Sequence, residues 1–113
     1  MSDCVFCRIA AGEIPARIVH RDDDAVAFHD LAPRAPTHIL VVPRRHLASL
    51  AEVTPDDSAL LGHLLGVAAE VARRLGHGDG FRLVVNNGAS AGQSVFHLHV
   101  HLLAGRDFTW PPG

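Results

Sequence analysis

The segment "SVFHLHVHLL", residues 94–103, has the most distinctive pattern in the chain. It places a histidine at every second position, His97, His99 and His101, with an aliphatic residue between each pair. Strict alternation predicts a β-strand whose side chains point to opposite faces in turn. The aliphatic face can pack beneath a helix. Because burying three imidazoles without partners is costly, we expect the histidine face to line a functional site.

Four more strands are predicted from short runs rich in Val, Ile, Phe and Leu. They cover residues 16–23, 24–30, 38–43 and 80–88, and an Asp-rich turn joins the first two as a hairpin. The nearly unbroken apolar run at 38–43 indicates a buried, central strand. A Gly-rich loop, "NNGASAGQ", connects the last predicted strand of this set to the histidine strand.

One long helix is predicted after Thr54, which can act as the N-cap, with Pro55 at the first helical position. Leucine, valine and alanine then recur at helical spacing as far as Leu75, and Gly76 ends the pattern. The N-terminal "CVFCRIAAGEIP" predicts a second, short helix. Five strands joined mainly as hairpins and one main helix define an α+β fold, an antiparallel meander sheet with the helix on one face. A homodimer formed through a sheet edge is a reasonable expectation, because open edges need to be paired or covered.

Length and composition narrow the class of protein. A chain of 113 residues is expected to form a single domain, residues 1–113. Its formal charge of −2 argues against a nucleic-acid-binding arm or a basic membrane patch. No apolar run approaches the roughly 20 residues of a membrane span. The N-terminus lacks the pattern of a signal peptide, so we expect a cytoplasmic protein with no nucleic-acid or membrane partner.

The two cysteines, Cys4 and Cys7, form a C-x-x-C pair at the start of the chain. In a reducing compartment such a pair is more often half of a metal site or a redox motif than a disulfide. A thioredoxin-like redox pair normally follows a strand, and no strand is predicted before Cys4. The pattern therefore favours a metal site.

Two kinds of chemistry compete for the three histidines. Imidazole is a common zinc ligand, but on a flat strand the first and third histidines lie about 13 Å apart, so at most two could bind one ion. Alternatively, a neutral imidazole can attack phosphorus and form a covalent intermediate while its neighbours donate hydrogen bonds. The preceding loop favours this second chemistry, because its glycines allow the backbone to approach an anion closely.

The histidine segment and its surroundings resemble a known protein family. "HLHVHLL" matches the His-φ-His-φ-His-φ-φ signature of the histidine-triad (HIT) superfamily, where φ is apolar. Residues 27–46, residues 83–103 and the ending "GRDFTWPPG" at 105–113 are similar to the Hint branch, the nucleoside phosphoramidate hydrolases. The resemblance covers essentially the whole chain. It implies a HIT-like fold whose sheet continues across a homodimer.

The resemblance also implies roles for individual residues. His99 matches the nucleophile, which attacks the α-phosphorus of a nucleotide, and His101 matches the residue that contacts the phosphate and assists the leaving group. His38 matches the histidine that supports the triad, and Asp30 matches the acid that holds the ribose hydroxyls. Further positions match residues that line the nucleoside pocket or bind the phosphate or leaving group: Leu31, Asn86, Gly92, Gln93 and Ser94.

Members of the family that begin with C-x-x-C bind structural zinc. In this chain their four ligands match Cys4, Cys7, His46 and His97. Two thiolates and two imidazoles leave no open position, as a structural zinc site requires. The resemblance therefore implies one zinc ion per chain that takes no part in the chemistry.

The function implied is hydrolysis of purine nucleoside phosphoramidates of the AMP type, through a covalent nucleotidyl-histidine. In the family the C-terminal tail, residues 105–113, reaches toward the partner's active site, which makes Trp110 a candidate for substrate selectivity. The sequence also allows two alternatives. One is a dinucleoside polyphosphate hydrolase of the same superfamily, and the other is a nucleotide-binding or zinc-stabilised interaction module.

Overall fold

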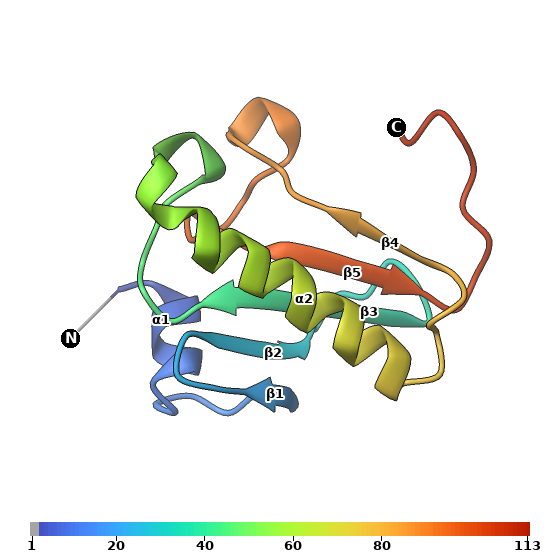
Figure 1. Ribbon diagram of the computed structural model, residues 1–113, viewed down its shortest axis with the longest axis horizontal. Helices are drawn as coiled ribbons and strands as arrows, with labels where there is room; N and C mark the ends of the chain where they lie inside the picture. Colours follow the sequence, from blue (N-terminus) through green and yellow to red (C-terminus); the bar gives the residue numbers. More distant parts are fainter. Residues whose placement is uncertain (1–2) are drawn as a thin grey trace.

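A computed structural model describes residues 3–113 of the chain, so Met1 and Ser2, the first residues of the expected domain, lie outside it. The helices are α1 (Val5–Ala10) and α2 (Ser58–Arg74), with short 3₁₀ turns at Leu50–Glu52, Pro55–Asp57 and Ala89–Ala91. The strands are β1 (Ile18–Arg21), β2 (Ala25–His29), β3 (Thr37–Pro43), β4 (Phe81–Val84) and β5 (Val100–Ala104). Figure 1 shows α2 lying across one face of the sheet, with α1 and the C-terminal tail at opposite sides of the molecule.

Within the described residues the five strands form one antiparallel sheet in the order β1-β2-β3-β5-β4. This confirms the predicted α+β class and the central place of β3. The order departs from a simple meander at its end. The chain leaves β3, passes through α2 and returns at the far edge as β4, and β5 then fills the gap between β3 and β4.

Two apolar cores lie on opposite faces of the sheet. The first is beneath α2 and contains Leu98, Val100 and Leu102, the predicted aliphatic face of the histidine segment, together with Leu64 and Val71 of α2. The second is beneath α1, and its buried members are Phe6, Ile9, Ala10, Val26, Phe28, Leu40 and Val42. The short helix α1 therefore covers the face of the sheet that α2 leaves open.

The histidine strand is shorter than predicted, because β5 begins only at Val100. The register that pairs Val41 with Val100 would place Pro43 opposite Leu98. Proline has no backbone N–H to continue the ladder. The Leu98 N–H instead donates to the carbonyl of Leu47, at 2.6 Å. His97 and His99 thus lie in an irregular segment that leads into the strand, and the expectation of one regular strand over 94–103 is wrong.

The entry to α2 is also less regular than predicted. Thr54 precedes a 3₁₀ turn, Pro55–Asp57, and the α-helix proper starts at Ser58. The Asp57 carboxylate accepts the Thr54 N–H at 2.9 Å and pairs with Arg45. These contacts form a capping box, so Thr54 does mark the start of the helical segment.

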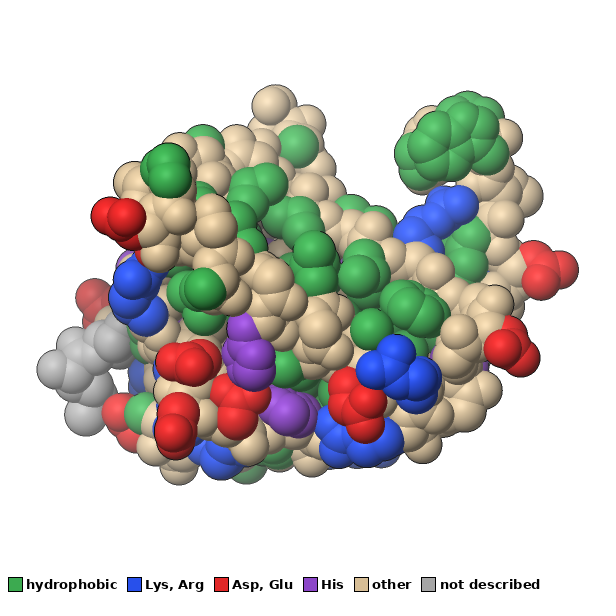
Figure 2. Space-filling view, viewed as in Figure 1, with side chains coloured by type: hydrophobic (Ala, Val, Ile, Leu, Met, Phe, Trp, Pro, Cys, Tyr) green, Lys and Arg blue, Asp and Glu red, His purple; other side chains and the backbone are tan. Residues whose placement is uncertain are grey.

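The C-terminal tail begins at Gly105, whose φ of +93° suits glycine and whose Cα faces Pro36. A Cβ there would lie 2.9 Å from the Pro36 Cβ, so a side chain would clash. Beyond this turn the chain stands off the body of the molecule and ends in exposed hydrophobic side chains (Figure 2). Trp110 is 82% exposed. In the part of the chain that is described, no helix has the length and apolar character needed to cross a bilayer.

Candidate active site and metal centre

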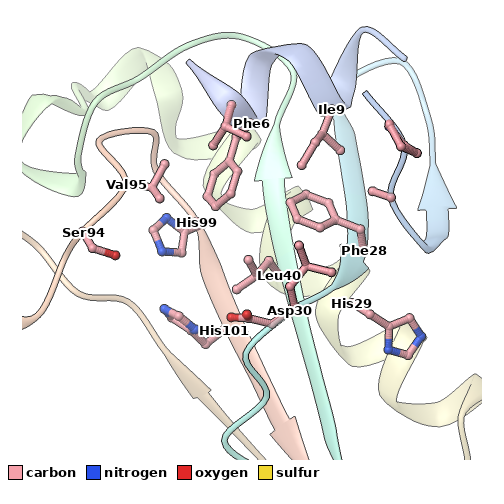
Figure 3. Close-up of a pocket in the computed structure, with 14 residues that line it drawn as sticks. Phe6, Ile9, Phe28, His29, Asp30, Leu40, Ser94, Val95, His99 and His101 are labelled. Carbon is pink, nitrogen blue, oxygen red and sulfur yellow. The ribbon is translucent and has the colours of Figure 1, made fainter. Parts of the chain in front are cut away.

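A pocket of about 300 Å³ opens between α1, the end of β2 and the histidine segment. Figure 3 shows Phe6, Ile9, Phe28 and Leu40 on its apolar side and Asp30, Ser94, His99 and His101 on its polar side. An apolar cavity with a few converging polar groups is the usual form of a small-molecule site. The predicted residues Asp30, Leu31, Ser94, His99 and His101 all line it.

His99 presents an unprotonated nitrogen to this pocket. Its Nδ1 lies 2.7 Å from the carbonyl oxygen of His97. A carbonyl oxygen only accepts, so Nδ1 carries the hydrogen. In the neutral ring the Nε2 then holds a lone pair, as a nucleophile requires. The ring itself is buried, with 8% of the residue exposed.

A chain of two hydrogen bonds sets the opposite polarity at His101. The backbone N–H of Arg34 donates to His38 Nδ1 at 3.0 Å, so the proton of a neutral His38 resides on Nε2. That Nε2–H donates to His101 Nδ1 at 2.9 Å. A neutral His101 therefore carries its own proton on Nε2 and can donate it to a ligand. The His38 ring is buried, and its Nε2 also lies 3.5 Å from the Asp30 carboxylate.

The electrostatic environment keeps the His38 and His101 rings neutral. Burial, together with the neighbouring His99 and His38, lowers the pKa of His101 to about 4. Burial also lowers the pKa of His38, with the Asp30 carboxylate acting in the opposite direction. Near pH 7 both rings are uncharged, which is the state that the hydrogen-bond chain requires.

A second, more polar cavity of about 420 Å³ adjoins the first. Asp30, Ser94 and His101 line both, whereas His38 and Asn86 line only the second. His99 borders only the first cavity. A ligand with its reacting atom between His99 and His101 could thus extend in two directions, into an apolar and a polar space.

The remaining predicted residues occupy different places. Gln93 is buried and holds the loop together: its Oε1 accepts the Gly88 N–H, and its Nε2 donates to the carbonyls of Ala48 and Val95. Gly92, with a φ of +98°, adjoins the Asn86 amide. Neither residue lines the two cavities, and neither does Trp110 of the tail.

The expected metal ligands do come together. Cys4, Cys7, His46 and His97 each offer one ligand atom, and these atoms all lie within 4.8 Å of one another. The His97 Nδ1 lies 3.2 Å from Cys4 Sγ, 3.4 Å from Cys7 Sγ and 3.1 Å from His46 Nδ1. A tetrahedral zinc ion holds such ligands about 3.3–3.8 Å apart, and the three distances from His97 Nδ1 lie in or just below this range.

The outer contacts of His97 also suit a metal ligand. Its Nε2 lies 2.8 Å from the carbonyl oxygen of Pro43 and must donate to it, which leaves the Nδ1 lone pair facing the two thiols. The ring is completely buried. The donor set and the fixed tautomer both fit a closed four-coordinate metal site.

Sequence reasoning missed the apolar wall of the pocket. Phe6 and Ile9 read as core residues of a short helix, and no spacing signal distinguishes a core phenylalanine from one that faces a ligand. Arg34 and Pro43 were also missed, because each acts through its backbone, which a side-chain pattern does not reveal.

Comparison with known proteins defines the class. The family model of the HIT domain matches residues 11–108. A HIT-like protein from Synechocystis is 58% identical over 98% of this chain and 97% of its own length. The crystal structure of a HIT family hydrolase from Legionella pneumophila superimposes with a TM-score of 0.96 at 48% identity, covering 98% and 100% of the two chains. A histidine triad protein from Clostridium difficile gives 0.92 at 44% identity, covering 96% of each.

With fold, histidine segment and family match in agreement, the chain belongs to the HIT family.

Proposed function

We propose that this protein is a hydrolase of nucleotidyl substrates, and specifically a purine nucleoside phosphoramidate hydrolase of the Hint type. The observation that supports this most directly is a pair of neighbouring imidazoles with opposite tautomers at the polar end of an apolar pocket. In their neutral forms His99 has a lone pair on Nε2, whereas His101 has a hydrogen there. The similar Legionella protein is named a hydrolase, which agrees with this proposal.

Different residues of the pocket bind different parts of the substrate. The purine enters the apolar space between Phe6, Ile9 and Phe28, and Leu31 lies at its exposed rim. Asp30 accepts hydrogen bonds from the ribose hydroxyls, a role suited to a carboxylate. The α-phosphate lies between His99, His101 and Ser94, and the leaving group extends toward Asn86 in the second cavity. Gly92 and Gln93 act by shaping the loop that presents Ser94.

The reaction proceeds by covalent catalysis in two displacements. His99 Nε2 forms a bond to the α-phosphorus as the P–N bond breaks, and the substrate nitrogen, protonated in the reactive form, departs as a neutral amine. Water then attacks phosphorus, the P–Nε2 bond breaks, and AMP and neutral His99 result while the remaining proton passes to solvent. The His101 Nε2–H donates a hydrogen bond to the phosphoryl group in both steps.

The metal site plays a structural part in this proposal. Zinc held by Cys4, Cys7, His46 and His97 would fix the start of α1 to the histidine segment, and its closed coordination supplies no catalytic position. We also propose a single domain over the whole chain, acting as a cytoplasmic homodimer whose tail residue Trp110 influences selectivity.

The decisive assay compares two substrates on one preparation. Adenosine 5′-phosphoramidate should be hydrolysed with a much higher kcat/KM than a diadenosine polyphosphate, and the reverse order would favour the polyphosphate hydrolase. His99→Ala should lower phosphoramidase activity by about 10³-fold or more, whereas His63→Ala on the exposed side of α2 should leave it unchanged. Activity that survives in His99→Ala, or AMP binding with no turnover by the wild type, would favour the binding module.

A further inference from the structure

Helix α1 contributes to both the metal cluster and the pocket. Cys4 caps its N-terminus and Cys7 lies one turn along, and both belong to the metal cluster. Phe6 and Ile9, on the same turns, line the pocket. A six-residue helix is not stable by itself, so its position depends on its packing and on what the two thiols bind.

Phe6 is the side chain that joins the two sites. It is 6% exposed, and its ring packs against three other aromatic rings. Its ring centroid lies 5.9 Å from that of the metal-cluster residue His97, at an interplanar angle of 72°. It lies 5.2 Å from that of His99, at 87°, and 5.5 Å from that of Phe28, at 69°. Figure 3 shows the Phe6 ring beside His99, above it and to its right in the view.

A second connection runs through the backbone. His97 holds the tautomer of His99, because its carbonyl oxygen accepts the His99 Nδ1–H. The His97 ring is fixed on one side by the Pro43 carbonyl and on the other by the metal cluster. Any shift of His97 would therefore move both the ring packed on Phe6 and the acceptor that orients His99.

We propose that metal binding and nucleotide binding are energetically coupled in this protein, with Phe6 as the positioning residue that transmits the coupling through α1. Metal bound to Cys4 and Cys7 holds Phe6 against His99 and completes the apolar wall of the pocket. Nucleotide packed against Phe6 holds α1 in the position at which the thiols meet His46 and His97. The inference rests on the proposed function only in requiring that AMP occupy the pocket.

Loss of the metal should loosen α1 without unfolding the molecule. The larger core, between α2 and the sheet, has no member from α1. The residues that α1 contributes to the other core are Phe6, Ile9 and Ala10. The metal-free protein is therefore expected to retain its sheet and α2, which makes the coupling measurable.

Calorimetric titration of the full chain with AMP tests the coupling. AMP should bind about tenfold more weakly to chelator-treated protein than to zinc-loaded protein. Because linkage is reciprocal, saturating AMP should raise the zinc affinity by the same factor, measured by competition with a chromophoric chelator at buffered free zinc. AMP dissociation constants that agree within twofold in the two forms would overturn the proposal while leaving the nucleotide site intact. AMP binding to neither form would instead contradict the nucleotide site itself, and the coupling with it.

Two matched variants locate the coupling. Phe6→Leu and Phe28→Leu make the same change in the same pocket, but only Phe6 lies on α1 and contacts His97. Phe28→Leu should weaken AMP binding in both forms and keep the tenfold ratio between them. Phe6→Leu should reduce that ratio to about two. A full tenfold ratio in Phe6→Leu would show that the coupling does not pass through this residue.

Hydrogen exchange provides a readout that is independent of ligand affinity. The Arg8 and Ala11 amides, which donate to the carbonyls of Cys4 and Cys7 at 3.1 and 3.0 Å, should exchange faster after zinc removal, and AMP should partly restore their protection. Amides of β3 and β5 should keep their protection throughout. Equal loss of protection in α1 and in these strands would mean global unfolding and would contradict a local coupling.

Discussion

The histidines at 97, 99 and 101 differ in which ring nitrogen bonds to the protein and in whether that nitrogen donates or accepts. His97 donates from Nε2 to Pro43, which leaves Nδ1 for the metal cluster. His99 and His101 both use Nδ1 in a hydrogen bond to the protein. His99 donates to the carbonyl oxygen of His97, and His101 accepts from His38. Their Nε2 atoms therefore present a lone pair and an N–H, respectively. The different roles of similar residues follow from these backbone and side-chain partners.

The hydrogen-bond chain through His38 can be tested by substitution. His38→Ala removes the donor to His101 Nδ1, so His101 can adopt the tautomer that has no proton on Nε2. We expect kcat to fall by about 10- to 100-fold, since a fixed donor is lost, while the AMP dissociation constant stays within about twofold. His38→Gln, which offers an amide N–H, should recover part of kcat. A rise in KM with unchanged kcat would contradict a role in orienting His101.

The lowered pKa of His101 predicts a pH-dependent stability. In the unfolded chain this ring titrates near pH 6.5, and in the folded protein near 4. Between these values the unfolded chain binds more protons, so the free energy of unfolding should fall as the pH drops from about 6.5 to 4. Urea unfolding at pH 7 and pH 5 should show a smaller loss for His101→Asn than for the wild type. Metal ligands protonate equally in both proteins, so equal losses would contradict the buried, neutral His101.

At the scale of elements, hydrophobic patterning predicts β2, β3, α2 and the aliphatic face of the histidine segment correctly. It does not predict the place of β4, because any antiparallel order keeps the same alternation of faces. Nor does it predict that β5 starts at Val100. That boundary depends on the register that brings Pro43 opposite Leu98, which is a property of strand pairing rather than of either segment alone.

The turn between β1 and β2 is tied to α2 through one carboxylate. Asp22 Oδ2 accepts from His20 at 2.6 Å and from His63 of α2 at 2.7 Å. Its Oδ1 accepts the backbone N–H groups of Asp24 and Ala25, each at 2.8 Å. Partial burial alone would raise the pKa of Asp22, but these hydrogen bonds outweigh it and lower the pKa. The carboxylate thus links the hairpin to the helix above it.

Removing this carboxylate should destabilise the fold. Asp22→Ala is expected to lower the free energy of unfolding by about 2 kcal/mol, because several donors lose their acceptor at once. Asp23→Ala, at the exposed neighbouring position, should change it by less than about 0.5 kcal/mol. Chemical denaturation of the two variants makes the comparison. Equal effects would show that the turn tolerates loss of the tie to α2.

At the scale of the whole molecule, the tail and the oligomeric state remain predictions. The tail leaves the body of the molecule after Gly105 (Figure 1). Trp110 in this tail is largely exposed in the single chain. Within residues 3–113, β1 and β4 are the sheet edges, and an edge is the place where a second copy can add its strands. Single-chain patterning cannot establish which edge is used, because the pairing depends on a second molecule.

Truncation after Arg106 tests the role of the tail. We expect light scattering to give about twice the chain mass of 12.1 kDa for the full-length protein. We expect the truncated protein to show an altered ratio of kcat/KM values between bulky and small amine leaving groups. An unchanged ratio in a protein that remains dimeric would contradict the proposed part of Trp110 in selectivity.

In the proposed mechanism, His99 is the nucleophile in the transfer of a nucleotidyl group to water. Rapid quenching of the wild type in alkaline denaturant during turnover of adenosine 5′-phosphoramidate preserves an acid-labile P–N bond to histidine, and peptide mass spectrometry at alkaline pH then locates it. We expect an adenylyl group on the His99 ring, in the peptide that contains it, and none in His99→Ala. Turnover with no adduct on His99 at any quench time, together with persistent activity in His99→Ala, would contradict it.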